Sequence, residues 1–343
     1  MLPVKRVFPF GWLVLCSLVF LGPIPAIGQP APDGWTVPRT SDDQPDFQGV
    51  WANNTATPRQ RPEAWSEKEH LSQEELSQVM AAAAEASDPG QDALFGDQLI
   101  LAAIEKTTAK SYDPTTGNYN QFWIANRTFN TDRTSLVIDP PDGRIPEVTP
   151  QARARRAQRA VHRQEHPADT YTDRPLAERC VSYGVPRIGA GYNSYFQIFQ
   201  SKDYVVVYQE MIHDARVIPI GDHPALPESI RQLHGDSRAH WEGDTLVIET
   251  SNYTAESTFR GATRDLQVTE RFTRTGPDIL NYDVTFEDTA TWVKPWTASI
   301  PLRHTDDAIF EYACHEGNIG MEGILAGHRA EERATADETG SEQ

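Results

Sequence analysis

Apolar and polar residues alternate along most of the second half of the chain. In the segment 279–286, Leu280, Tyr282, Val284 and Phe286 share one face, and polar residues occupy most of the other. A period of two is typical of a strand with one buried face and one face in water. Many such segments joined by short turns predict an antiparallel meander, and closure into a barrel would remove its exposed edges.

Strands are predicted over residues 135–138, 195–199, 204–212, 217–220, 245–250, 266–272, 279–286, 296–302 and 309–313. Further strand signals begin at Tyr119 and continue over residues 121–128. The predicted fold class is therefore mainly β, an antiparallel meander closing into a barrel, with an N-terminal arm and a few peripheral helices.

The region before the strands predicts an extended arm and two helices. Residues 29–61 are rich in proline and polar residues, with large apolar side chains only at isolated positions. Ser72 and Glu75 fit a capping box, which indicates the start of a helix that ends before residue 88. A second, shorter helix is expected over residues 97–106.

A basic helix is predicted within the β-rich region. Thr149 is a suitable N-cap, and Pro150 suits the first helical position. The helix, near residues 150–165, carries five arginines. We interpret these arginines as a solvated face that balances an acidic protein.

Residues 1–28 have the pattern of a secretory signal peptide. Lys5 and Arg6 precede an apolar run, and small residues stand three and one positions before Gln29. An uncleaved membrane anchor is the alternative, but the run is shorter than the roughly 20 residues of a spanning helix. We therefore expect cleavage near Gly28–Gln29 and a periplasmic or secreted protein that is not inserted in the membrane.

The remaining chain divides into three segments. We expect residues 29–118 to form the arm and helices packed on the core. Residues 119–329 are expected to form the barrel-like domain, with the basic helix near residues 150–165 inserted into it. Residues 330–343 are polar and acidic, so we expect a disordered tail.

Net charge limits the partners. The 343 residues carry a formal charge of −18, and the leader holds two basic residues and no acid, so the processed chain would carry −20. Such a chain is repelled by nucleic-acid phosphate and by anionic membranes, and we expect neither as a principal partner. A small-molecule ligand or substrate is the expected partner.

Two cysteines remain after the leader, Cys180 and Cys314. An even number of cysteines in an exported protein predicts a disulfide. The alternative is two buried free thiols. A disulfide would tie the beginning of the β-rich region to its last predicted strand.

Several short motifs resemble a large family of secreted bacterial proteins. They are RTSL at residues 133–136, DPPDGRIP at 139–146, MIHDAR at 211–216, HGDSRAHWEGDTL at 234–246 and KPWT at 294–297. The resemblance covers roughly residues 44–329. It implies export and a lipocalin-like, β-rich C-terminal region, but it transfers no catalytic residue and no activity.

Segment 234–240 holds the densest group of chemically active side chains. His234, Asp236 and Arg238 alternate, so they would fall on one face of a strand. Asp236 would orient the imidazole of His234 for acid–base work, and Arg238 would hold a substrate anion. We predict that these three catalytic candidates line one cavity with at least one of Glu210, Arg216 and Glu270. An exposed hairpin arm is the alternative.

A second group follows the strand predicted from residue 204. Alternation places Glu210 and Arg216 on one apolar face with Tyr208, whereas His213 faces the other way. Charges on an apolar face need partners, so a buried Glu210–Arg216 pair is the structural interpretation and a pocket floor is the functional one. Glu270 is a further inward acid that would pair with an arginine.

Four further candidates for substrate contact are Trp296, Tyr208, His315 and Glu316. Trp296 and Tyr208 belong to an aromatic set that would line the lumen of a hollow barrel, or form the core of a filled one. His315 and Glu316 directly follow Cys314, at the end of the last predicted strand, and are candidates for the rim of a site.

No metal and no organic cofactor are expected. The sequence lacks the His-Glu-x-x-His motif, clustered thiolates, a glycine-rich phosphate loop and a dinucleotide fingerprint. It also lacks the Gly-x-Ser-x-Gly elbow of the α/β-hydrolases.

Three functions remain open from the sequence. The first is an exported, cofactor-independent enzyme that performs lyase, isomerase or hydrolase chemistry on a small organic molecule. The second is a non-catalytic barrel that carries an apolar or aromatic molecule through the periplasm. The third is a structural domain. The sequence determines neither the substrate nor the oligomeric state.

Overall fold

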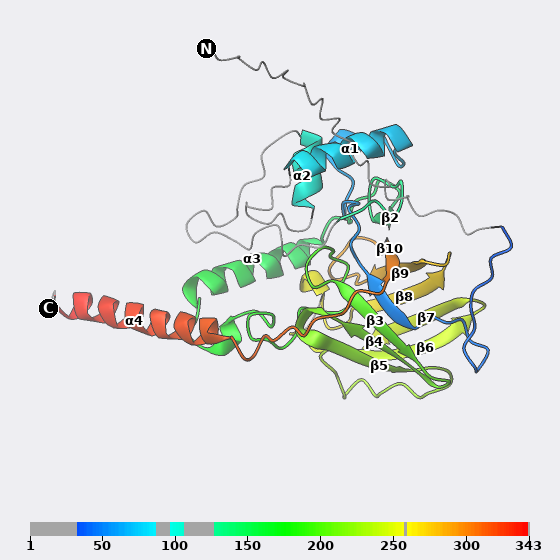
Figure 1. Ribbon diagram of the computed structural model, residues 1–343. Coiled ribbons are helices and arrows are strands. Elements are labelled where there is room, and N and C mark those ends of the chain that lie inside the picture. Colours follow the sequence, from blue (N-terminus) through cyan, green and yellow to red (C-terminus); the bar gives the residue numbers. More distant parts are fainter. Residues whose placement is uncertain (1–32, 87–96, 106–126, 257–258, 342–343) are drawn as a thin grey trace, which may run out of the picture.

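Nine strands form one antiparallel sheet that curves into a nearly closed barrel, as the sequence predicts (Figure 1). The structure, a computed structural model, describes residues 33–86, 97–105, 127–256 and 259–341. The strand order is β5-β4-β3-β1-β10-β9-β8-β7-β6, and β2 pairs with β10 beside this path. The strands are β1 (Gly49–Ala52), β2 (Val137–Asp139), β3 (Tyr195–Gln200), β4 (Tyr204–Gln209), β5 (Asp214–Pro219), β6 (Asp236–Glu242), β7 (Thr245–Ser251), β8 (Gln267–Arg274), β9 (Ile279–Glu287) and β10 (Trp296–Thr305).

The two outer strands of the sheet, β5 and β6, meet at one place. Ile220 and Ala239 form a parallel bridge, and the Gly221 amide donates to the Ala239 carbonyl at 2.8 Å. The other neighbouring strands of the path pair antiparallel, and only this bridge joins β5 and β6 within the described residues. We call this incompletely paired junction the seam.

The interior of the barrel is packed with aromatic side chains. Phe272 stacks on Tyr282 and Phe286 stacks on Trp296, each with ring centroids 4.4 Å apart, and all four are fully buried. These rings are the core of the protein. The alternative of a filled core therefore holds for these four rings, and the carrier function stays a prediction. Tyr208 lies on the outer face of β4, because the buried residues of that strand alternate with it.

The N-terminal arm contributes a strand to the sheet. β1 pairs with β3 on one side and with β10 on the other. The expectation of an arm that only lies over the core is therefore wrong for these residues. Trp51 is fully buried, and its indole nitrogen donates to the Phe47 carbonyl at 2.8 Å. The boundary expected at residue 118 does not separate the arm from the barrel, because β1 fills the space between β3 and β10.

Two helices form a small second core beside the barrel. They are α1 (Gln73–Ala86) and α2 (Gln98–Glu105). The predicted capping box is present, since the Glu75 amide donates to Ser72 Oγ at 3.2 Å and the Ser72 amide donates to Glu75 Oε2 at 2.9 Å. Leu76 and Ile100 pack in this cluster of buried residues.

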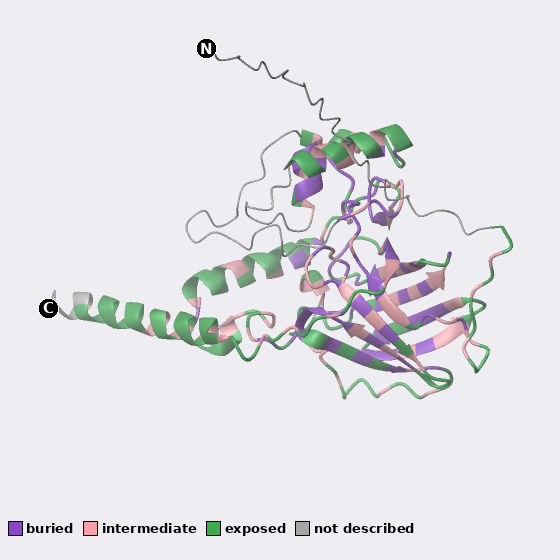
Figure 2. Ribbon diagram, in the orientation of Figure 1, coloured by how far each residue is buried: buried purple, intermediate pink, exposed green. Residues whose placement is uncertain are grey.

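The predicted basic helix is α3 (Pro150–Glu165), and Thr149 caps it by accepting from the Ala152 amide. A last helix, α4 (Ile319–Ser341), extends away from the barrel (Figure 1). None of its described side chains is buried (Figure 2). The expectation of a disordered tail is wrong for residues 330–341, because alanine, glutamate and arginine in this segment favour the helix.

Two other strand predictions have different outcomes. Residues 309–313 are not a strand and belong to the irregular segment between β10 and α4. The strand signals at 119–126 and the predicted signal peptide lie outside the described residues.

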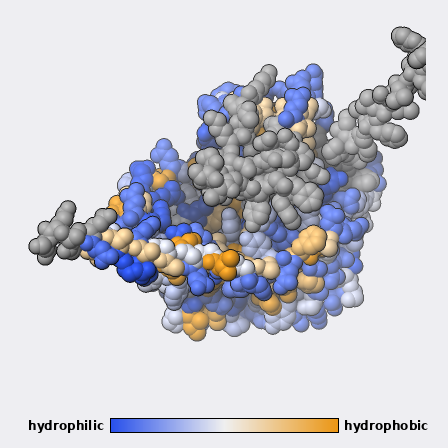
Figure 3. Space-filling model, turned by 60° about the vertical axis from the view of Figure 1, so that its left-hand side comes forward, coloured by the Kyte–Doolittle hydropathy of each residue, from blue (hydrophilic) through white to orange (hydrophobic). Residues whose placement is uncertain are grey.

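The described helices include none that is long and apolar enough to cross a membrane. The face shown in Figure 3 is mainly hydrophilic, with apolar residues in small scattered groups.

Cys180 and Cys314 form the predicted disulfide, with their Cα atoms 5.6 Å apart. Cys314 lies in the segment between β10 and α4 and not in a last strand. The bond therefore joins the segment before β3 to the segment that leads into α4.

Reduction of this disulfide is expected to lower the melting temperature and leave the barrel folded. The bond closes a loop of 134 residues, and on the chain-entropy model such a cross-link contributes at most about 4–5 kcal/mol. Neither cysteine lies in a strand. Thermal unfolding with and without reductant, and of the variant Cys180→Ser/Cys314→Ser, measures the effect. An unchanged melting temperature in both cases would contradict the expectation.

Candidate functional site

A cavity of about 290 Å³ lies at the seam. It is lined by residues 215–218 of β5 and by residues 232–238, which lead into β6. We call it the seam cavity. The structure brings His234, Asp236 and Arg238 to this cavity together with Arg216, as the sequence predicts. Their catalytic role stays a prediction, because the cavity shows placement only.

The three residues do not share a strand face. β6 begins at Asp236, and His234 belongs to the preceding turn. Gly235 has φ +72°, and a Cβ there would lie 2.6 Å from the Ser251 carbonyl oxygen and 2.6 Å from Thr250 Cγ2. Glycine is required at this point, because a side chain would suffer both the backbone strain and the contact. The turn places the histidine beside β5.

His234 interacts with two residues that the sequence analysis did not assign to it. Its Nε2 atom lies 3.0 Å from Ser182 Oγ and 3.3 Å from Asp214 Oδ1. Ser182 Oγ also donates to Asp214 Oδ2 at 2.9 Å. Ser182 and Asp214 are buried, whereas the His234 side chain is 22% exposed. Asp214, and not the predicted Asp236, is therefore the carboxylate that orients this imidazole.

The hydrogen bonds assign the tautomer of His234. Ser182 has one hydroxyl proton, which goes to Asp214, so its oxygen accepts from the imidazole and from the Gly184 amide at 2.9 Å. Nε2 therefore carries a proton. The hydrogen bonds of the described residues leave Nδ1 unused, and this nitrogen keeps its lone pair. Ser182 is buried, and its hydroxyl contacts Asp214, His234 and the Gly184 amide.

Burial shifts both ionisable members of this cluster. It lowers the pKa of His234, against the attraction of the Asp214 carboxylate, and the Arg216 charge lowers it further. Burial also raises the pKa of Asp214, while His234 and the Ser182 hydroxyl act in the opposite direction. Opposed shifts at a cavity are typical of functional acid–base pairs, although structural networks show them too.

Arg216 forms the most deeply buried ion pair of the described structure. Its Nη1 and Nη2 atoms donate to Glu270 at 2.6 and 2.8 Å, and the Tyr282 hydroxyl donates to the same carboxylate at 2.5 Å. The pairing predicted between Glu210 and Arg216 is wrong, because the inward side of β5 faces β8 across the barrel. Burial disfavours the Arg216 charge, but Glu270 more than offsets this and raises its pKa.

Asp236 and Arg238 hold a loop on the outside of the barrel. Their side chains are 2.5 Å apart, Asp236 accepts from the Leu226 amide at 2.8 Å, and Arg238 donates to the Pro224 carbonyl at 2.8 Å. Both side chains lie on the outer face of β6, because the side chain of Ala239, the residue that follows Arg238, points into the core. The predicted role of Arg238 as an anion clamp is not favoured, since its donors are already engaged.

The remaining candidates gather around a different hollow. Glu210 is buried and accepts from the Tyr195 amide at 3.3 Å. It lines a groove of about 1010 Å³ that runs beside the disulfide. We call this the acidic groove, because its acids and aromatic residues are Glu178, Glu210, Asp307, Glu311, Tyr192, Tyr195, Phe310 and Tyr312.

His213, His315 and Glu316 lie outside both hollows. His213 Nδ1 is 3.2 Å from the Tyr312 carbonyl oxygen, and its ring is 6.4 Å from that of His315. His315 and Glu316 are exposed in the turn after the disulfide. Trp296 is fully buried in the core. Of the predicted substrate contacts, only Arg216 lines the seam cavity, and only Glu210 lines the acidic groove.

A helical histidine pair lies far from the predicted site. His162 and His166 are spaced by four residues at the end of α3, and their rings are 4.9 Å apart. This spacing is readable in the sequence as a possible pair of metal ligands. Ser182 had no comparable signal, because only the fold brings it to His234.

Comparison with protein-family models, with curated proteins and with solved structures gave no match. The fold and the site by themselves define the class of protein, which is an antiparallel β-barrel with a charged cavity at its seam.

The pH dependence of stability should depend on His234. Below its usual pKa of about 6.5 the unfolded histidine binds a proton that the folded one, with its lowered pKa, does not hold. The free energy of unfolding therefore rises with pH up to about 6.5. In the variant His234→Gln this contribution is absent. The melting temperature of the native protein minus that of the variant should become more positive between about pH 5 and about pH 7.5. A difference independent of pH would exclude the buried, neutral histidine.

Loss of the Glu270 charge should destabilise the protein strongly. Glu270→Gln leaves Arg216 charged and buried without its counter-ion, which costs about 3–5 kcal/mol. The control is Glu242→Gln, which removes the exposed 2.7 Å pair with Arg271 and should cost at most about 1 kcal/mol. Chemical denaturation measures both variants. Equal losses would show that the interior pair contributes no more than a surface one.

Proposed function

We propose that the protein is an exported, cofactor-independent enzyme that uses His234 as a general base and acid on a small organic molecule. The observation that carries this proposal is the His234–Asp214 pair with Ser182, at the wall of the seam cavity. Lyase, isomerase or hydrolase chemistry all require such a proton transfer.

The residues have separate roles in this proposal. Asp214 lies 3.3 Å from Nε2 and stabilises the imidazolium that forms when Nδ1 takes a proton. In serine proteases a carboxylate also holds the catalytic histidine, but there it contacts Nδ1 and leaves Nε2 as the base. Here Asp214 lies near Nε2, and Nδ1 is the base. Arg216 Nε is buried and has no hydrogen-bond partner within the described structure. Arg216 lines the cavity, and in this proposal its Nε would donate to a substrate acceptor.

Several observations support an exported protein. The disulfide is typical of oxidising compartments, and the leader sequence predicts cleavage near Gly28–Gln29. We also propose membership of the secreted bacterial family that the sequence motifs resemble. The acidic charge makes a small molecule, and not a nucleic acid, the expected partner.

The test is incubation of the purified protein with metabolite mixtures, followed by mass spectrometry. The native protein should consume at least one compound. His234→Gln should lower the rate by about 10²–10⁴-fold, because proton transfer contributes that much. Asp214→Asn should lower kcat less and alter its pH profile, since the amide no longer stabilises the imidazolium.

His240→Gln is the matched control, because His240 lies on β6, exposed and paired with Glu242. This variant should keep native activity. All three variants should keep the native circular dichroism spectrum. Full activity of His234→Gln would exclude this residue as the base, and absence of turnover by the native protein would argue against an enzyme.

A second candidate function is non-catalytic binding of an organic cation in the acidic groove. The groove combines four carboxylates with four aromatic rings, and its lining residues include no lysine, arginine or histidine within the described chain. Carboxylates and aromatic faces attract organic cations. The same mass-spectrometric screen separates the two functions, since a carrier retains its ligand unchanged and is unaffected by His234→Gln.

A further inference from the structure

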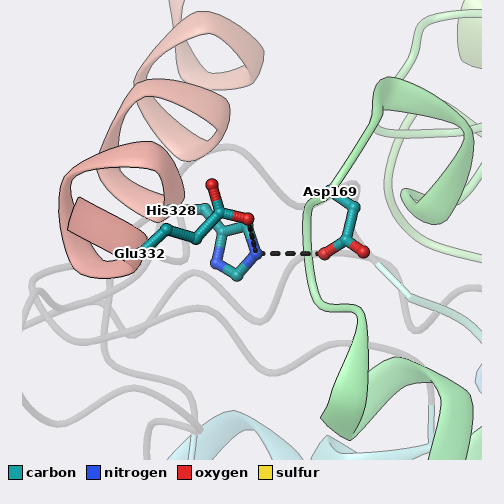
Figure 4. A group of neighbouring side chains, drawn as sticks. All are labelled: Asp169, His328 and Glu332. Carbon is teal, nitrogen blue, oxygen red and sulfur yellow. Dashed lines mark hydrogen bonds and ion pairs between the residues drawn. The ribbon is translucent and has the colours of Figure 1, made fainter. Parts of the chain in front are cut away.

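Three potential metal ligands meet where α4 contacts the loop after α3. His328 and Glu332 are four residues apart on α4, and Asp169 lies in the loop between α3 and the short helix η3 (Tyr171–Asp173). His328 points at both carboxylates (Figure 4). The ligand atoms of the three residues lie within 4.8 Å of one another.

The distances between these atoms suit a small divalent cation. His328 Nε2 is 3.1 Å from Asp169 Oδ1 and 3.6 Å from Glu332 Oε1. Two ligands bound at about 2.1 Å in tetrahedral geometry are about 3.4 Å apart. A cation placed between the three atoms would therefore reach each ligand with only small side-chain rotations.

A second set of residues supports the two carboxylate ligands, as is typical of metal sites. The other oxygen of Asp169 is 2.7 Å from His166 Nδ1. The other ring nitrogen of His328 is 3.8 Å from a carboxylate oxygen of Glu331. Arg329 donates to the second oxygen of Glu332 at 2.7 Å. These contacts orient the ligand atoms toward one another.

We propose that Asp169, His328 and Glu332 bind a divalent transition-metal ion, with zinc as the best match to this nitrogen and oxygen donor set. Three protein ligands leave the remaining position to water. His166 is a positioning residue in this site, because it contacts Asp169 and not the ion.

The site would fix α4 against the body of the protein. α4 has no buried side chain among its described residues, and it contacts the loop after α3 through His328 and Arg329. A cation shared by the two elements would therefore join them more firmly than these polar contacts do. Metal binding would be visible as increased protection of the α4 amides from hydrogen exchange.

The experiment uses the full chain after removal of metals with a chelator. Zinc binding is measured by competition with a chromophoric chelator, and cobalt is added as a spectroscopic probe of tetrahedral coordination. We expect one zinc ion per chain and slower hydrogen exchange in α4. His328→Gln and Asp169→Asn should each weaken zinc binding at least tenfold, since each removes a ligand.

His223→Gln is the matched control, because this histidine lies in the loop beside β5, where its ring is near Tyr204. It should leave zinc affinity unchanged. His166→Gln should weaken binding less than His328→Gln. The double variant His162→Gln/His166→Gln tests the histidine pair of α3 as the site. Absence of stoichiometric zinc binding, or binding that survives His328→Gln and is lost in the double variant, would overturn the proposal.

Discussion

The structure depends on how a sheet of nine strands closes. Its two outer strands run in the same direction, so the antiparallel pairing that builds the rest of the sheet cannot continue between them. They touch at the Ile220–Ala239 bridge. Beyond this bridge the strands separate toward residue 216, and the opening becomes the seam cavity. The candidate site therefore lies where the backbone pairing of the two outer strands ends.

Buried charge is the second consequence of this closure. Arg216 points inward from the outer strand β5 into a core of stacked aromatic rings, and it is tolerated there because Glu270 accepts from it twice and Tyr282 completes the carboxylate. A charge in such a place needs a partner, since desolvation alone costs several kcal/mol. The same charge lies close enough to His234 to lower its pKa. The ion pair between Arg216 and Glu270 is therefore linked electrostatically to His234 at the seam cavity.

The periphery has a different organisation. The disulfide fixes the segment between β10 and α4 to the segment before β3, and α4 then contacts the loop after α3 through His328 and Arg329. The acidic groove runs beside the disulfide. Its walls come from two regions of the chain, residues 177–210 and 307–318, so its shape depends on the cross-link as well as on the barrel.

The sequence by itself determined the β meander, the capping residues Ser72 and Thr149 and the cysteine pair. Each of these follows from local information: a period of two, a capping motif, or an even number of cysteines in a chain whose leader predicts export. The short strand β1 was missed because four residues between polar and proline-rich segments show no clear alternation, and only its neighbours β3 and β10 make it a strand. The helix at the C-terminus was missed because polar, acidic composition was weighed above helix propensity.

For the site, the sequence named His234, Arg216 and Glu270, because ionisable residues among apolar strands are conspicuous. Only the tertiary structure decided their partners. Arg216 meets Glu270 across the barrel interior, and His234 meets Ser182 and Asp214 from segments 52 and 20 residues away. Strand alternation predicted a face for His234 that the turn at Gly235 prevents. Long-range pairing is set by barrel closure, which is a property of all nine strands and is not encoded in any one segment.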